Sequence, residues 1–231
     1  MRNQTLVGLC RWTDHISCTG ITPLLNTRGT IRRKTRSAVS QTSAREVVAR
    51  ALSTDPESVQ LISSCDEQPL VFVDGVRRGS VSWSYSGSSL AVAVSAGPVT
   101  GVDLVKSQRS VGLDVFFNLH GSTEELGWIA RAPDSFNAHS RLWAAKEALG
   151  KALGCGLGCG WDALRIHPLS NRVFAPGQPD AAKDLFIYSD RFKDVELSVA
   201  LEIANGGLEI CDWRNSERCI CISLDRKIRK V

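Results

Sequence analysis

The stretch Arg141 to Leu157, RLWAAKEALGKALGCGL, constrains the fold more than any other part of the chain. Helix-forming residues dominate it, and apolar residues recur at helical spacing, which predicts an amphipathic helix that packs into a core. Glu147 and Lys151 are four residues apart, so they lie one turn apart on a different face. Gly150 lies within this helix, which suggests that another part of the molecule lies close to its backbone. Periodicity alone favours a solvated Glu–Lys pair on a helix surface.

Segments with strand character lie on both sides of this helix, and turn residues separate them. Strands, one helix and more strands precede it, and further strands follow it. This order predicts an α+β fold with two similar lobes. The expected helix is Thr42–Leu52, and Thr123–Arg131 is a further candidate helix. A hairpin turn is expected at Asp74-Gly75 and a loop at Pro168–Pro179. The expected strands are Thr5–Trp12, Ser58–Ser63, Leu70–Val73, Val81–Ser86, Leu90–Ser95, Val99–Val105, Trp161–His167, Asp184–Tyr188, Glu196–Ile203, Leu208–Trp213 and Arg218–Leu224.

Composition and charge exclude several functional classes. With 231 residues, 43% of them hydrophobic, the chain is long enough to bury a sizeable core. A net charge of +4 suits acidic partners but is too small to indicate nucleic-acid binding. The N-terminus lacks an apolar run typical of a signal peptide, and no window resembles a membrane span, so we expect a cytoplasmic protein. The eight cysteines then fit as reduced thiols rather than as a zinc site.

Three motifs in order resemble those of a known family. The helix carries W-A-A-K-E-A-L-G-K-A-L-G-C-G-L from Trp143 to Leu157, and G-V-D-L-V precedes it at Gly101 to Val105. Ser84 to Gly87, S-Y-S-G, lies further upstream. Together these motifs resemble the 4′-phosphopantetheinyl transferases, in particular the larger two-lobed, surfactin-synthetase-activating type. A second G-L-D-V copy at Gly112 to Val115 lies closer to the helix and has no S-Y-S-G stretch at the right interval, so we favour the first copy.

The resemblance implies a fold and an activity. The fold is a pseudo-dimer of two α+β lobes with the active site between them, assigned to residues 1–104 and to residues 105–231 with a basic C-terminal tail. The activity is a holo-[acyl-carrier-protein] synthase type transfer of 4′-phosphopantetheine from coenzyme A to a serine of an acyl or peptidyl carrier protein. It depends on Mg²⁺, for which Mn²⁺ can substitute. We expect a monomer that binds neither nucleic acid nor a membrane.

The resemblance also implies the residues that hold the metal and assist the reaction. Asp103 and Glu147 correspond to the magnesium ligands, and two carboxylates with a pyrophosphate oxygen suit this ion. Glu147 corresponds to the general base for the carrier serine. Lys151 is the second catalytic residue and stabilises charge on the phosphates.

Coenzyme binding is implied for Lys146, Lys151, Ser84 and Tyr85. The family has histidine where this chain has Tyr85, and many two-lobed members have glutamate where it has Val105. Tyr85 therefore favours an alternative hypothesis, a non-catalytic relative that binds coenzyme A or a carrier protein without transfer. A third hypothesis is a generic α+β binding domain in which the motif is coincidental.

The segment between the two motifs, Phe116 to Ile129, is predicted to contain part of the surface on which the carrier docks. Large apolar residues stand there in a polar setting, and some of them must belong to the core. Carrier proteins are usually acidic, so nearby basic residues should make their association sensitive to salt.

Overall fold

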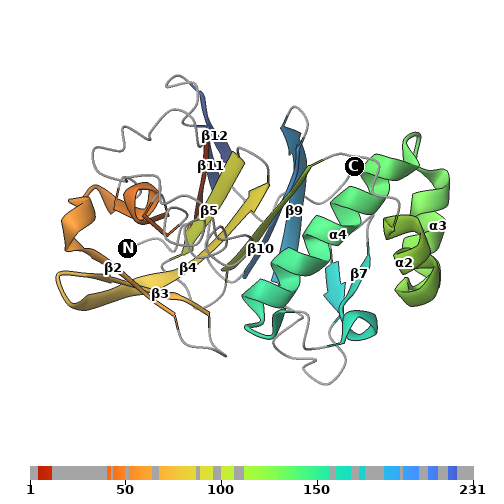
Figure 1. Ribbon diagram of the computed structural model, residues 1–231, viewed down its shortest axis with the longest axis horizontal. Helices are drawn as coiled ribbons and strands as arrows, with labels where there is room; N and C mark the ends of the chain where they lie inside the picture. Colours follow the sequence, from red (N-terminus) through yellow and green to blue (C-terminus); the bar gives the residue numbers. More distant parts are fainter. Residues whose placement is uncertain are drawn as a thin grey trace, which may run out of the picture.

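The computed structural model describes residues 5–11, 41–42, 44–49, 52–63, 68–86, 89–95, 100–106, 112–156, 160–167, 172–174, 185–192, 195–202, 208–212 and 218–222. Within these ranges the protein combines helices with two β-sheets, which confirms the predicted α+β class. The sheets lie next to each other at the centre, and the helices lie on the outside (Figure 1). The basic residues between Thr22 and Ser40, and the basic C-terminal tail, lie outside the described ranges.

The larger sheet has seven strands in the order β12-β11-β1-β5-β4-β3-β2. Helical residues 44–49 cover it, and their buried side chains pack against strands β2 to β5 as one hydrophobic cluster. Asp74 and Gly75 form the predicted turn between β3 and β4, and both have the positive φ that a tight hairpin requires. The strands are β1 (Thr5–Arg11), β2 (Val59–Ile62), β3 (Leu70–Val73), β4 (Val76–Ser86), β5 (Ser89–Ser95), β11 (Leu208–Asp212) and β12 (Arg218–Ile222).

The smaller sheet has five strands in the order β6-β10-β9-β8-β7, and α4 crosses it along β6 and β10. A second hydrophobic cluster joins the helices to this sheet. The strands are β6 (Thr100–Lys106), β7 (Arg165–His167), β8 (Arg172–Phe174), β9 (Leu185–Phe192) and β10 (Val195–Glu202). The helices are α2 (Leu113–His120), α3 (Thr123–Arg131) and α4 (Ser135–Ala152), with short 3-10 turns η2 (Pro56–Ser58) and η4 (Trp161–Ala163).

Helix α4 is the predicted helix, shifted towards the N-terminus. It begins at Ser135 because Asp134 accepts a hydrogen bond from the backbone N–H of Asn137. It ends at Ala152 because Gly154 takes a left-handed φ of 72°. A Cβ on Gly150 would lie 2.5 Å from the carbonyl oxygen of Gly156, so the following loop folds back onto the helix, as the mid-helix glycine predicted.

The C-terminal strands return to the first sheet. β11 pairs in parallel with β1, from Thr5 opposite Leu208 to Leu9 opposite Asp212, and β12 pairs with β11. These strands extend the sheet built from the first half of the chain, and the division into lobes of residues 1–104 and 105–231 stays a prediction. The assumed boundary at residue 104 also falls inside β6. Parallel pairing between distant segments leaves no local signal, and therefore spacing alone did not indicate it.

Three serines on β4, called the serine stripe below, join the two sheets: Ser82, Ser84 and Ser86. β6 is an edge strand of the smaller sheet, and its outward backbone groups face β4. The Ser82 hydroxyl accepts a hydrogen bond from the N–H of Val102 at 3.0 Å, and the Ser86 hydroxyl accepts one from the N–H of Lys106 at 2.9 Å. Side chains thus satisfy backbone groups that a neighbouring strand would otherwise pair. This junction places β6, and the site residue on it, against the first sheet.

Helix α4 and strand β6 approach each other closely at Gly101. A Cβ on this residue would lie 1.9 Å from the carbonyl oxygen of Ala148 and 2.6 Å from the backbone nitrogen of Ala152. Only glycine fits this contact without displacing the helix. The glycine of the G-V-D motif therefore sets the distance between the strand and helix that carry the other two motif residues.

Two further observations concern the sequence predictions. Cys155, in the turn after α4, is disulfide-bonded, whereas the sequence predicted reduced thiols. Spacing alone did not indicate that the fold brings another cysteine within bonding distance. Among the helices in the described ranges, none is long and apolar enough to cross a membrane.

Candidate active site

Asp103 stands at the centre of the candidate site. It lies on β6, its side chain is 9% exposed, and one of its oxygens receives two hydrogen bonds. The Ser84 hydroxyl donates to Oδ1 of Asp103 at 2.7 Å, and the Lys151 ammonium donates to the same oxygen at 2.6 Å. No residue in the described ranges donates to Oδ2. The carboxylate is thus held by one oxygen while the other stays available as a ligand.

Lys151 reaches this carboxylate from α4. Its ammonium also donates to the carbonyl oxygen of Val102 at 3.1 Å, so it binds both the side chain and the backbone of β6. The Lys151 side chain is 30% exposed. The sequence predicted that Lys151 and Asp103 act at one site, and the structure brings them into direct contact.

Glu147 lies one turn before Lys151 on the same face of α4 and is partly buried. The pKa of the Glu147 carboxyl is raised above its ordinary value, mainly by burial and secondly by the negative charge of Asp103. The positive charge of Lys151 opposes this shift. The interaction shows that the two predicted carboxylates lie close enough to influence each other. A carboxyl with a raised pKa holds a proton more readily near neutral pH, which suits a general base.

Lys146 lies on a different side of α4, inside the core of the second half. Its side chain is 1% exposed and forms an ion pair with Glu125 of α3 at 2.9 Å. Burial lowers the pKa of the Lys146 ammonium, and Glu125 opposes that shift. Consecutive helix positions point about 100° apart, so Lys146 leaves α4 in a different direction from Glu147 and pairs with Glu125. Its predicted role as a phosphate ligand stays a prediction.

Glu125 is a structural residue that the sequence analysis missed. Its carboxylate accepts hydrogen bonds from the backbone N–H groups of Ser122 at 2.9 Å and Ile166 at 3.2 Å, in addition to the Lys146 contact. Ser122 in turn accepts from the N–H of Glu125, which completes a capping box at the start of α3. The spacing Ser122-x-x-Glu125 is the sequence signal that indicates the cap, but nothing local indicates the lysine.

Ser84 and Tyr85 point to opposite faces of β4, because side chains alternate along a strand. Ser84 faces Asp103, whereas Tyr85 stands on the face that carries Val81 and Trp83 of the first hydrophobic cluster. Tyr85 is 44% exposed. The structure therefore brings Ser84 to the candidate site and places Tyr85 on the other side of the strand.

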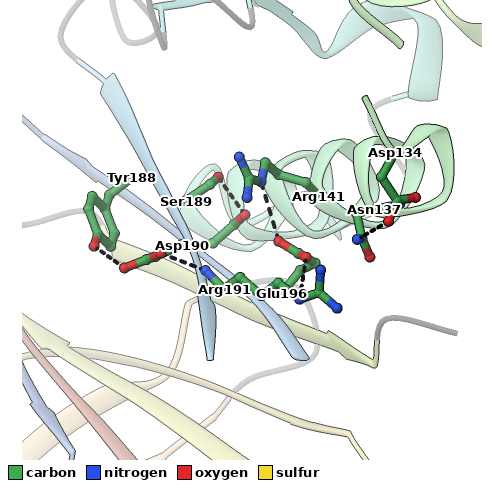
Figure 2. Close-up of polar contacts among 9 residues, drawn as sticks. Asp134, Asn137, Arg141, Tyr188, Ser189, Asp190, Arg191 and Glu196 are labelled. Atoms are coloured by element: carbon green, nitrogen blue, oxygen red, sulfur yellow. Dashed lines mark hydrogen bonds and ion pairs between the residues drawn. The ribbon is translucent and has the colours of Figure 1, made fainter. Parts of the chain in front are cut away.

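A second polar cluster lies beneath the N-terminal half of α4 (Figure 2). Glu196 of β10 is fully buried and pairs with Arg141 of α4 at 3.3 Å and with Arg191 of β9 at 3.7 Å. In the strand register Glu196 stands opposite Val105. The two arginines hold this carboxylate.

The two copies of the G-x-D motif occupy different environments. Asp103 is buried on β6 and contacts Lys151, whereas Asp114 is exposed in the first turn of α2. The choice of the first copy for the site is thus supported by the contact with Lys151.

Two carboxylates and one lysine suit a magnesium-dependent reaction on phosphates. Mg²⁺ commonly binds one or two protein carboxylates and completes its octahedron with water and substrate phosphate oxygens. Asp103, with one oxygen available, and the neighbouring Glu147 meet this requirement. In the described part of the chain no group of three or more His, Cys, Asp or Glu side chains gathers as a protein-only metal cage. The residues present fit an ion that is shared with a phosphate substrate.

Comparison with known families agrees with this geometry. Residues 100–202, just under half of the chain, match the model of the 4′-phosphopantetheinyl transferase superfamily. That segment carries a 4′-phosphopantetheinyl transferase superfamily domain. It contains β6, all three labelled helices and strands β7 to β10, and thus Asp103, Glu147 and Lys151. The superfamily match supports a transferase. No curated protein matches the chain.

Ser84 lies outside the matched segment, although it donates a hydrogen bond to Asp103 within it. The first sheet therefore contributes a polar contact to the candidate site.

Proposed function

We propose that the protein transfers 4′-phosphopantetheine from coenzyme A to a serine of an acyl or peptidyl carrier protein. The observation that carries the proposal is the contact of Asp103 with Lys151 beside Glu147, all within the segment that matches the superfamily. In the reaction the carrier serine forms a new bond to the phosphorus next to pantetheine. The pyrophosphate P–O bond breaks, and adenosine 3′,5′-bisphosphate leaves.

Each residue has a role in this proposal. Glu147 accepts the serine proton, directly or through a water molecule, and its raised pKa supports that role. Lys151 donates to phosphate oxygens as negative charge develops on them. Asp103 and Glu147 would hold Mg²⁺ or Mn²⁺, which supplies charge neutralisation at the pyrophosphate. Ser84 keeps Asp103 in place through its hydrogen bond.

The two-lobed pseudo-dimer belongs to the same proposal. Each half of the chain has its own hydrophobic cluster of helix against sheet, and the serine stripe joins the two sheets beside Asp103. A site between two lobes within one chain would need no second copy, so we propose a monomer. Size-exclusion chromatography with light scattering tests this point.

The proposed activity fits the cytoplasmic location expected from the sequence. The disulfide at Cys155 weighs against a reducing compartment, because disulfides are rare there. Peptide mapping of protein purified with thiols blocked before lysis decides whether the bond exists in cells.

The experiment that tests the function combines the protein with coenzyme A, magnesium chloride and an apo carrier protein. Intact-mass spectrometry should show the carrier gaining one phosphopantetheine group. A carrier with its acceptor serine replaced by alanine, and a reaction with EDTA, are the controls and should show no gain. If several carriers from fatty acid, polyketide and peptide synthesis all stay unmodified, the transferase proposal is wrong.

A non-catalytic coenzyme or carrier binder is the second candidate, because Tyr85 stands where the family has histidine. Tyr85 lies on the opposite face of β4 from Ser84, which contacts Asp103. Tyr85→His is the informative variant. If the wild type binds coenzyme A tightly and neither protein modifies a carrier, the binding candidate is the better description.

A further inference from the structure

Lys151, Asp103 and Glu147 form a compact charged group. The Lys151 ammonium lies 2.6 Å from Asp103 Oδ1, and its positive charge also lowers the pKa of the Glu147 carboxyl against burial and Asp103. Two close carboxylates repel each other, and a cation between them offsets the repulsion. Lys151 thus already supplies part of the positive charge that a divalent ion would supply.

A metal ion on the other oxygen of Asp103 and on Glu147 would weaken the contact between the Lys151 ammonium and Asp103. Magnesium binds carboxylate oxygens at about 2.0–2.1 Å, so an ion on Asp103 and Glu147 would lie next to the ammonium. Like charges at that separation repel strongly in a partly buried site. The lysine has a flexible four-carbon stem, and 30% of its side chain is exposed, so its ammonium has somewhere to go.

We propose that Lys151 is a built-in counter-ion for Asp103 and Glu147, which a divalent metal displaces and which then becomes free to bind the coenzyme's pyrophosphate. This inference rests on the proposed function for its substrate, but the exchange of lysine for metal concerns the site alone. Because coupling between two ligands is reciprocal, a phosphate that attracts the lysine should also strengthen metal binding. The site would then bind metal weakly until the coenzyme arrives.

The test measures Mn²⁺ affinity of the full chain without coenzyme A, by electron paramagnetic resonance of free Mn²⁺. Lys151→Met removes the charge and keeps most of the length. It should bind Mn²⁺ about tenfold more tightly than wild type, within the range typical of coupled sites. Lys151→Arg keeps the charge and should stay close to wild type. Lys106→Met removes an exposed lysine on the same strand as Asp103 and controls for net charge.

The effect of Mn²⁺ on thermal unfolding separates the exchange from a purely structural role of Lys151, because Mn²⁺ would not restore the Tm lost with a structural lysine. In EDTA, Lys151→Met leaves two carboxylates without their counter-ion, so its Tm should fall below that of wild type. Saturating Mn²⁺ should remove most of this difference, because the metal replaces the lost charge. A Tm deficit that Mn²⁺ leaves unchanged would contradict the exchange.

Wild-type protein alone provides a second measurement if Lys151→Met does not fold. Acetylation by an amine-reactive reagent, followed by peptide mass spectrometry, reports how accessible each lysine amine is. Magnesium should increase the acetylation rate of Lys151 and leave that of Lys106 unchanged. The proposal is overturned if magnesium does not change the Lys151 rate, if Lys151→Met binds Mn²⁺ no more tightly than wild type, or if Lys106→Met has an equal effect.

These outcomes are separable from the proposed function. Metal affinity and lysine labelling need no carrier protein, so a failure to modify carriers would refute the transferase and leave the exchange standing. Efficient carrier modification without any effect of Lys151 on metal affinity would refute the exchange alone.

Discussion

Replacing Gly101 with alanine tests whether the contact between α4 and β6 builds the site. The added methyl would lie 1.9 Å from the Ala148 carbonyl oxygen, about 1.5 Å inside the 3.4 Å at which ordinary contact begins. The second close atom, the backbone nitrogen of Ala152, also belongs to the helix. Neither atom can rotate away as a side chain would, so the whole helix must shift.

The size of the effect follows from this geometry. Overpacking a core usually costs about 1–3 kcal/mol, and a clash with helix backbone should lie at the upper end, about 3 kcal/mol. A shift of the helix would also displace Lys151 and Glu147 of α4 relative to Asp103 of β6. Misplacement by about 1 Å can reduce a rate about 100-fold, so activity should fall at least that far.

Urea unfolding followed by tryptophan fluorescence measures the free energy of unfolding, and carrier mass spectrometry measures the rate. Gly127→Ala is the matched control, because its Cβ would meet only the flexible Arg131 side chain at 3.4 Å. It lies within α3, where alanine should stabilise by about 0.5–1 kcal/mol. If Gly101→Ala unfolds within about 0.5 kcal/mol of wild type and keeps its rate, the close packing described above is wrong.

Three further predictions concern charged residues. Asp103→Asn should abolish transfer and Mn²⁺ binding while Asp114→Asn keeps both, and the opposite order would show that the wrong motif copy was chosen. The raised pKa of Glu147 means that the folded state holds its proton more tightly than the unfolded state, so wild-type stability falls as pH rises above the ordinary pKa of 4.5. Glu147→Gln lacks this proton, so in EDTA its Tm minus the wild-type Tm should increase towards neutral pH, and a difference that does not change with pH would contradict this. Lys146→Met should lower the free energy of unfolding in urea by about 3–5 kcal/mol because the buried Glu125 carboxylate loses its ion-pair partner, and adding Glu125→Gln should restore part of the loss. Unchanged stability together with a raised KM for coenzyme A would instead support the phosphate role of Lys146.

The sequence indicated much of the candidate site because its chemistry is concentrated in short motifs. Asp103 ends up beside Lys151 and Glu147 since one motif lies on an edge strand and the other on the helix that crosses it. Helical spacing predicted that Glu147 and Lys151 share a face. The mid-helix Gly150 predicted a close approach, which the loop at Gly156 makes.

Other features depended on contacts between distant segments. Lys146 is adjacent to Glu147 in the sequence, but its partner is Glu125 on another helix, and no local pattern joins them. Strand alternation separates Ser84 from Tyr85, and this could have been anticipated from the strand prediction alone. The sequence also treated residues 168–179 as a loop, whereas β8 forms there as a three-residue strand held by β7.

The parallel pairing of β1 with β11 affects how the chain folds during synthesis and which fragments of it can be expressed. A ribosome releases β1 long before residues 208–212, so during synthesis one edge of β1 has no neighbour and presents unpaired backbone groups. The first sheet should therefore finish folding last, after the second half is complete. Expressing only residues 100–202 would remove β1, the serine stripe and Ser84 together, so the superfamily segment by itself should be a poor substitute for the whole protein.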